Sequence, residues 1–289
     1  MDISGKRMYQ NLKDLNFVRL STTDGETKAA EILVDKIKEM GWEARIETFK
    51  VPKYDVKKVA LEAVAPFNKQ YEVTGYGWSG NNAKDTIEAD LQYIEGFDEL
   101  SLRDVKGKIV LFAGGISSEQ FESLIKAGAL AFIGIAGFFL DKKGSYDLDV
   151  RLLRERQLKK GVLPGVCIHI NDALAMVESG VKRVKLTLEQ VEEEADSRNV
   201  IAEVPGTEFP DEKIVFTAHY DSVIFSHGMF DNGSGTVNNL EILRHYILNR
   251  PKRTVIFVFT GSEERGLFGS KAYVRDHEDQ LEQHLSYQH

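Results

Sequence analysis

The sequence predicts an α/β fold with a mixed, largely parallel sheet and a second domain inserted into the chain. Two runs of apolar, β-branched residues, 213–218 and 254–260, are typical of buried parallel strands. Between them, Ser234 to Asn249 has apolar residues at helical spacing, and Pro251 follows. Strand, helix and strand in this order predict a βαβ unit.

The N-terminal part of the chain predicts another helix and strand. Glu26 to Met40 has helical periodicity, with Thr23 and Asp24 as candidate N-terminal caps and Gly41 at its end. Apolar and polar residues then alternate from Trp42 to Thr48, as in a strand.

A long interval separates this pair from the βαβ unit, and it predicts an inserted domain. We expect residues 1–58 and 197–289 to form the main domain and residues 59–196 the insert. Within the insert, a turn and strand are expected over 104–112, a helix over 118–126 and a further strand over 128–134. The single cysteine, Cys167, lies in an apolar run, which indicates a buried thiol on a strand.

The bulk composition indicates a folded protein and argues against some classes of partner. A net charge of −8 and a pI of about 5.5 do not favour nucleic acid, whose phosphates attract basic patches. The sequence has no apolar run of membrane-spanning length and no signal-like segment after Met1. We therefore expect no nucleic-acid partner, no membrane insertion and a cytoplasmic location.

Three polar clusters follow or join the predicted strands of the βαβ unit. His219 and Asp221 follow the first strand, Asp231 precedes the helix, and Glu263 and Glu264 follow the second strand. Ligands bind outside the carboxyl ends of strands in open α/β sheets, so the clusters are expected to converge.

Imidazole and carboxylate groups in this arrangement suit a two-metal hydrolytic site. His219 offers a nitrogen ligand to zinc, and Asp231 is placed to lie between two ions and offset their repulsion. Asp221, two residues after His219, is on the same face of a strand end and can orient the imidazole. We assign Glu264 as a metal ligand and Glu263 as the base that takes a proton from the attacking water.

These motifs, His-x-Asp, Asp-x-Gly-Ser-Gly and Glu-Glu, resemble those of the co-catalytic zinc aminopeptidases. That family includes bacterial leucyl aminopeptidase and aminopeptidase Y and is related to glutamate carboxypeptidase II. The resemblance implies a three-layer peptidase domain with two zinc ions, in which His219 and Glu264 bind different ions and Asp231 bridges them. It also implies that Glu263 is the general base, that Asp221 supports the ligands, and that a non-proline cis peptide follows Asp231.

The insert resembles the protease-associated domain found inside several members of that family. The resemblance rests on Gly107-Lys108-Ile109-Val110-Leu111, the following helix, and the strand after Gly128. Two roles stay open for it: shaping the substrate cleft, or acting as a spacer that stabilises the main domain.

The family takes two further ligands, an aspartate and a histidine, from later in the chain than His289. Residues 285–289 resemble the approach to the strand that carries this aspartate. We therefore expect the chain to be truncated at its C-terminus and incomplete for catalysis. His277, His284 and His289 are candidate substitutes, but they lie in or near a charged tail, which favours solvated side chains.

The leading hypothesis is an aminopeptidase that hydrolyses the N-terminal residue of a peptide through a metal-activated water. One alternative is the related metallo-carboxypeptidases and deacylases, whose bridging aspartate lacks the Asn232-Gly233-Ser234-Gly235 continuation. Another is a non-catalytic binding protein, which would not need Glu263. The segment Gly228-Met229-Phe230 is either a substrate-facing wall or core. Exopeptidase polarity, side-chain preference and oligomeric state stay open.

Overall fold

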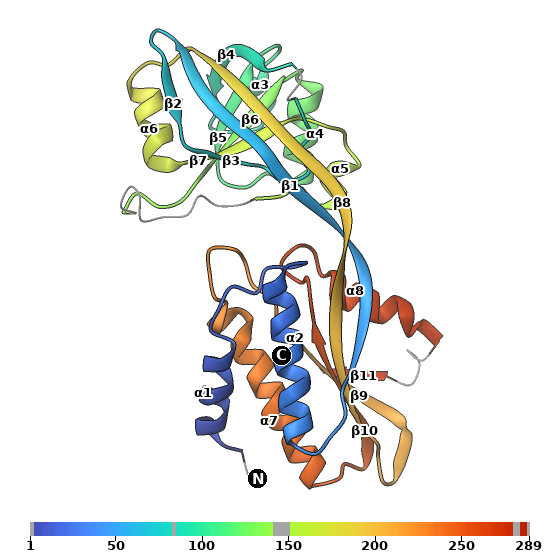
Figure 1. Cartoon of the computed structure of the whole chain (residues 1–289). Coiled ribbons are helices and arrows are strands. Elements are labelled where there is room, and N and C mark those ends of the chain that lie inside the picture. The colour runs from blue at the N-terminus through green and yellow to red at the C-terminus, as the bar shows by residue number, and fades with distance from the viewer. Residues whose placement is uncertain (1–2, 83–84, 141–150, 280–283, 288–289) are drawn as a thin grey trace. The chain divides into compact units, whose positions relative to one another are not determined.

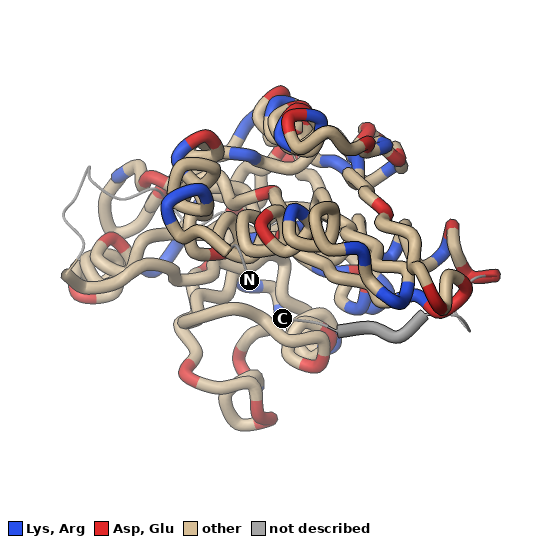
Figure 2. Tube along the Cα trace, turned by 90° about the horizontal axis from the view of Figure 1, so that it is seen from below, with Lys and Arg blue, Asp and Glu red and all other residues tan. Residues whose placement is uncertain are grey.

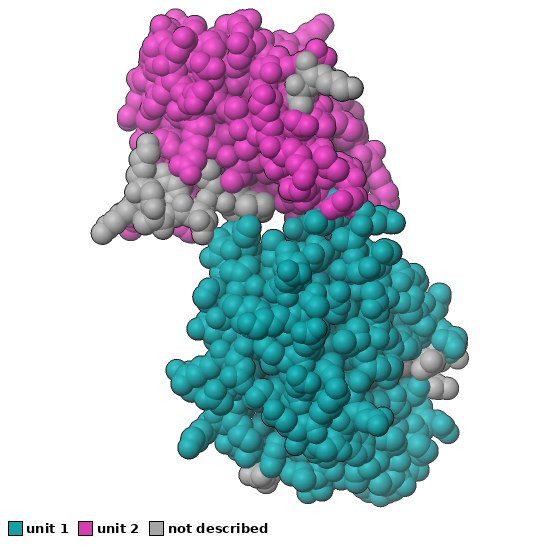
Figure 3. All heavy atoms as spheres, viewed as in Figure 1, with its two compact units in different colours: residues 1–53, 194–289 teal, residues 54–193 magenta. Residues whose placement is uncertain are grey.

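The computed structural model of the chain describes residues 3–82, 85–140, 151–279 and 284–287 (Figure 1). The chain forms two compact units (Figure 3). Unit 1 comprises Met1–Lys53 and Glu194–His289, and unit 2 comprises Tyr54–Glu193. The strands join in one 11-stranded sheet, and each unit has its own apolar core.

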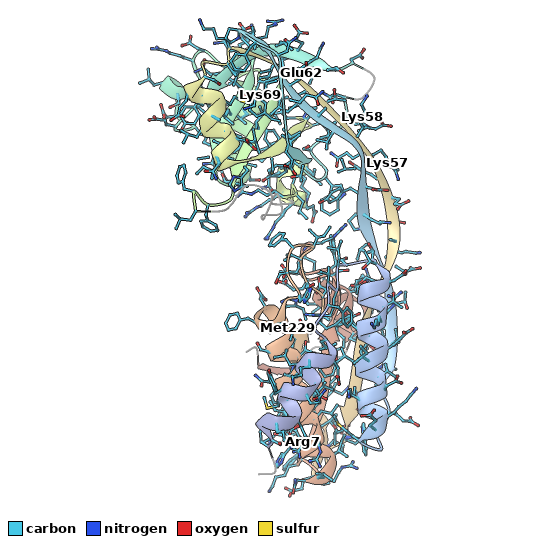
Figure 4. All side chains as sticks on the ribbon, turned by 60° about the vertical axis from the view of Figure 1, so that its left-hand side comes forward. Arg7, Lys57, Lys58, Glu62, Lys69 and Met229 are labelled. Carbon is cyan, nitrogen blue, oxygen red and sulfur yellow. The ribbon has the colours of Figure 1, made fainter. Side chains whose placement is uncertain are left out.

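Two long strands continue from one unit into the other. They are β1 (Arg45–Ala65) and β8 (Arg183–Val204), which pair with each other. The strand predicted from Trp42 to Thr48 thus begins later and runs much further than its alternation indicates. Polar, exposed positions such as Lys57 and Lys58 (Figure 4) hide this length, because they interrupt the pattern of a half-buried strand.

Unit 1 is built from helices and a sheet in the predicted βαβ order. Its remaining elements are α1 (Gly5–Asp14), α2 (Asp24–Glu39), β9 (Phe209–His219), η1 (Met229–Ser234), α7 (Gly235–Leu248), β10 (Arg253–Thr260), α8 (Phe268–Asp276) and β11 (His284–Tyr287). The strand order is β11-β9-β10-β8. β11 and β10 are parallel to β9, whereas β8 is antiparallel to β10. The sheet is therefore mixed, as predicted.

Both faces of this sheet are covered, which makes unit 1 a three-layer structure. One core cluster joins alternate residues of β8 and β10, such as Val200 and Phe257, to Leu33 of α2 and Leu240 of α7. The intervening positions of the same strands pack with Tyr273 of α8 in a second cluster. Figure 1 shows α1, α2 and α7 on one side of the sheet and α8 on the other. β10 is buried on both faces along almost its whole length, which explains its continuous apolar sequence, whereas β9 is only partly buried.

Unit 2 contains a mainly parallel sheet with short helices. Its elements are β2 (Lys69–Tyr71), β3 (Val73–Gly75), β4 (Ile87–Tyr93), α3 (Glu99–Leu102), β5 (Ile109–Ala113), α4 (Ser118–Lys126), β6 (Ala131–Ala136), α5 (Glu155–Leu158), β7 (Gly165–His169) and α6 (Ile170–Glu178). β4, β5, β6 and β7 pair in parallel, and β3 is antiparallel to β7. The predicted strand, helix and strand of the insert correspond to β5, α4 and β6.

The core of unit 2 lies on both faces of its sheet. Ile109 and Leu111 of β5 belong to one cluster, while Val110 and Phe112 belong to another. Cys167 on β7 is fully buried, as predicted. The likeness of this unit to a protease-associated domain stays a prediction.

Charges and hydropathy of the described residues give two further observations. Within these ranges, no helix is long and apolar enough to cross a membrane. Figure 2 shows the basic and acidic positions interspersed along the trace.

The core of unit 1 predicts a large difference between two leucines of the same helix. Leu240→Ala removes a side chain that is 1% exposed, whereas Leu248, near the end of α7, is 59% exposed. We expect Leu240→Ala to lower the free energy of unfolding by about 2–5 kcal/mol because it leaves a cavity. Leu248→Ala is the matched control, with an expected change within about 0.5 kcal/mol. Urea unfolding of both variants measures this, and equal losses would contradict the packing described.

Candidate metal centre

The sheet register places the predicted ligands at one edge. In the parallel pair of β9 and β10, His219 is opposite Thr260, and each is the last residue of its strand. The chain after β10 therefore reaches Glu263 and Glu264 beside His219. Asp231 enters from η1, the turn that precedes α7.

His219 is the centre of this group. Its Nε2 lies 3.0 Å from Oδ1 of Asp231 and 3.6 Å from Oε2 of Glu263. One ligand atom each from His219, Glu263 and Glu264 falls within 4.8 Å of the others. The His219 side chain is 9% exposed and that of Asp231 is 75% exposed, so the group has a buried side and an open side. The structure brings all four predicted metal and base residues together.

Asp221 lies behind His219 and is fully buried. Its Oδ1 is 3.4 Å from Nδ1 of His219, a distance suited to an ion pair with the protonated imidazole. The same carboxylate accepts hydrogen bonds from the backbone N–H groups of Glu263, at 3.0 Å, and Glu264, at 3.1 Å. Asp221 thus also fixes the turn that carries both glutamates. Spacing alone indicated only its contact with the imidazole.

Two ionisable groups at the centre have displaced pKa values. Burial lowers the pKa of His219, but Asp221, Glu263 and Glu264 outweigh it and raise the pKa to about 9. Burial raises the pKa of Glu264 to about 7; His219 opposes this shift, and the negative charges of Asp221, Asp231 and Glu263 add to it. The cluster of carboxylates therefore favours a cation among them, whether a proton on the imidazole or a metal ion.

The turn at η1 holds Asp231 in a specific backbone arrangement. The Asp231–Asn232 peptide bond is cis, as the resemblance implies, and both residues depart from helical angles. Oδ1 of Asn232 accepts a hydrogen bond from the N–H of Gly235 at 3.0 Å. A side chain on Gly235 would overlap Asn232. Phe230 is 90% exposed, so the interpretation of this residue as core is wrong.

Of the three candidate substitute histidines, only His277 has a described side chain, and it contacts another carboxylate. His277 lies at the end of α8, and its Nε2 is 3.0 Å from Oε2 of Glu47. The side chain of His284 and the whole of His289 lie outside the described residues.

Glu26 contacts the turn that carries Glu263 and Glu264, and the sequence analysis does not identify it as a site residue. Its buried carboxylate accepts hydrogen bonds from Ser197, at 2.8 Å, and from Ser262, at 3.1 Å. Ser262 precedes Glu263 and has a positive φ of 54°. Burial raises the pKa of Glu26, and its hydrogen bonds oppose the shift. In the sequence Glu26 appears only as an ordinary residue near a helix start, and a single sequence gives no signal of this distant contact.

The donor set fits zinc. Zinc binds imidazole nitrogen and carboxylate oxygen, and His219, Asp231 and Glu264 supply both. Glu263 faces the same imidazole nitrogen. A buried carboxylate beside the other ring nitrogen is the usual arrangement around a metal-binding histidine.

Comparisons with known proteins find peptidases. Residues 199–287 match the model of peptidase family M28. Carboxypeptidase Q from Bos taurus is 27% identical over 277 residues, which cover 90% of this chain and 58% of that protein. Carboxypeptidase Q from Homo sapiens is 25% identical and covers the same shares. The chain thus spans less than two thirds of the length of these curated relatives.

Two solved structures share the fold over nearly the whole chain. A zinc aminopeptidase from Bacillus subtilis matches with a TM-score of 0.79 and 24% identity, covering 99% of this chain and 68% of that chain. An aminopeptidase from Aneurinibacillus sp. strain AM-1 matches with a TM-score of 0.72 and 24% identity, covering 99% and 70%. At this identity the likeness concerns the fold.

The pKa of His219 predicts how the stability of the metal-free protein depends on pH. The folded state raises this pKa from 6.5 to about 9, so it binds the proton more tightly than the unfolded state does. The resulting stability is fully present below about 6.5 and is lost as pH rises to about 9. Glu264, also raised, acts in the same direction at lower pH.

We therefore expect the urea midpoint of the metal-free protein to fall across this pH range. His219→Gln should flatten the fall. His245→Gln is the control, because the His245 ring contacts Tyr246 on α7 and Asn249 directly after that helix. An unchanged slope in His219→Gln would show that the imidazole does not carry the effect.

Proposed function

We propose, from the match of residues 199–287 to the model of peptidase family M28, that the chain carries the centre of a zinc-dependent aminopeptidase. Its substrates are peptides with a free N-terminus, from which it removes the first residue. The observation that carries the proposal is the position of His219 Nε2, which faces the carboxylates of Asp231 and Glu263 at 3.0 and 3.6 Å. Metal-assisted hydrolysis uses side chains that bind the metal and a nearby carboxylate that takes a proton from the attacking water.

We assign His219 and Glu264 to separate zinc ions and Asp231 to both. Bound zinc would polarise the substrate carbonyl and make water a stronger nucleophile near neutral pH. Asp231 suits the shared position because its carboxylate is exposed on the open side of the group. Whether this chain holds two ions is part of the proposal.

Glu263 acts as the general base in this scheme. Its carboxylate accepts the proton of the attacking water and then delivers it to the nitrogen of the leaving amine. Asp221 holds the backbone N–H of Glu263 and orients the imidazole of His219, so it keeps base and ligand in a fixed relation. The buried Glu26 accepts a hydrogen bond from Ser262, the residue before Glu263, and so helps to fix the same turn.

Aminopeptidase activity is favoured over the alternatives by two observations. A structure of a zinc aminopeptidase from Bacillus subtilis that is 26% identical matches over 98% of this chain. The Asn232-Gly233-Ser234-Gly235 continuation, which the carboxypeptidase and deacylase pattern lacks, forms the turn that holds Asp231. Carboxypeptidase action is the second candidate, because the curated relatives carry that name. A protein that only binds its ligand would not need a carboxylate base at the position of Glu263, 3.6 Å from His219 Nε2.

Glu263→Gln tests the assignment of the base. The amide cannot accept the proton, so we expect the rate on an aminoacyl amide to fall by about 10²–10⁴. Zinc binding, measured by equilibrium dialysis, should stay close to wild type. The control is Glu31→Gln, which changes an exposed glutamate on α2. If the wild type hydrolyses the aminoacyl amide and Glu263→Gln hydrolyses it at the same rate, the assignment of the base is refuted.

Exopeptidase polarity is tested with a pair of blocked dipeptides. An aminopeptidase is expected to cleave a dipeptide amide with a free N-terminus and to leave an N-acetylated dipeptide with a free carboxylate intact. Product amines are measured by chromatography with added zinc. The reverse preference would assign the chain to the carboxypeptidase class while keeping the metal centre.

A further inference from the structure

We propose that Arg19 is a positioning residue for the metal centre: its buried guanidinium fixes the loop that joins His219 to Asp231. This inference rests on the proposed function, since it concerns the same metal-binding residues. Arg19 lies between α1 and α2, more than two hundred residues before the loop that it contacts.

The guanidinium of Arg19 is fully buried and bonded to backbone carbonyls. Nε donates to Tyr220 O at 2.5 Å, and Nη2 donates to Gly228 O at 3.0 Å. Nη1 donates to His227 O and, on its own segment, to Leu15 O and Phe17 O. The planar guanidinium therefore connects the backbone of residues 15–17 to the backbone of residues 220–228.

These acceptors lie at the two ends of one loop. Tyr220 directly follows His219, while Gly228 lies three residues before Asp231. Gly228 O also accepts a hydrogen bond from the N–H of Gly233 at 2.8 Å, which closes the turn around Asp231. Arg19 thus sets the separation of the two loop ends, and with it the 3.0 Å approach of His219 Nε2 to Asp231 Oδ1.

The backbone of Arg19 also bonds to Ser222, within the same loop. Its N–H donates to Ser222 Oγ at 2.9 Å, and its carbonyl accepts from the N–H of Ser222 at 3.1 Å. Gly228 has a φ of 55°, and a Cβ there would come within 2.7 Å of Ser222 Cβ and 3.1 Å of Arg19 Nη2. The loop therefore closes tightly onto the guanidinium.

A buried guanidinium is costly unless its donors and charge are satisfied. Burial lowers the pKa of Arg19, and the negative charge of Asp221 opposes the shift. The cation in turn offsets the charge of Asp221, the carboxylate that holds the Glu263 and Glu264 amides. A lysine would keep the charge but could not reach both loop ends, because its donors lie on a single nitrogen.

Zinc affinity of the metal-free chain tests the proposal without a substrate. Wild type, Arg19→Lys and Arg19→Met are titrated with zinc against a competing chelator, and urea unfolding of each metal-free protein is measured separately. We expect both variants to bind zinc about 10–100-fold more weakly, the usual effect of losing a group that orients ligands. Ser222→Ala, a milder change to the same loop, should weaken zinc binding by about two- to tenfold.

Arg7→Met is the matched control. Arg7 also ties the N-terminal segment to α7, through Glu241 at 2.5 Å, but it lies at the opposite end of unit 1 from Met229, the first residue of η1 (Figure 4). We expect this variant to lose stability and keep the wild-type zinc affinity.

The outcomes separate the proposal from its premise. If wild type binds no zinc, the proposed function fails and the role of Arg19 fails with it. If wild type binds zinc and folded Arg19→Lys or Arg19→Met binds it equally well, Arg19 is only structural and the inference is overturned. Should neither Arg19 variant fold, an unchanged affinity in Ser222→Ala overturns it, and a weakened one supports it.

Discussion

The arrangement of the metal centre depends on the buried carboxylate of Asp221. One oxygen faces His219 Nδ1 and accepts the N–H of Glu263, while the other accepts the N–H of Glu264. These groups come from the ends of two different strands, so the carboxylate joins them across the sheet edge. Hydrogen bonds from backbone amides to an ionised acceptor are strong, and losing a buried acceptor leaves its donors unsatisfied.

The rest of unit 1 positions the carboxylate of Asp221 and buries it. The parallel register of β9 and β10 brings His219 level with Thr260, and apolar clusters cover both faces of the sheet beneath the edge. The N-terminal segment then contributes two buried groups. Arg19 fixes the loop on the His219 side, and Glu26 supports Ser262 on the glutamate side. The arrangement at the edge therefore depends also on buried residues that are distant from it in the sequence.

Much of this could be predicted from the sequence, for a physical reason. Buried strands such as β10 must be apolar throughout, and the helix of a βαβ unit must show an apolar stripe, so both patterns are local. Metal ligands are restricted to few residue types, so His219, Asp231 and Glu264 are predicted as ligands from their type and order. The lengths of β1 and β8 were not predictable, because exposed polar positions conceal a strand whose pairing is with a distant segment. Arg19 and Glu26 were missed because their partners are about 170 to 240 residues away.

Asp221→Asn gives the most direct test of the central role of this carboxylate. Asparagine keeps the size and one acceptor oxygen but loses the charge and the second acceptor. Zinc affinity of the metal-free variant is measured by competition with a chelator, in protein shown to be folded by circular dichroism. The account predicts that affinity falls by about 10–100-fold, as expected when a ligand loses the group that orients it. Wild-type affinity in a folded Asp221→Asn protein would contradict it.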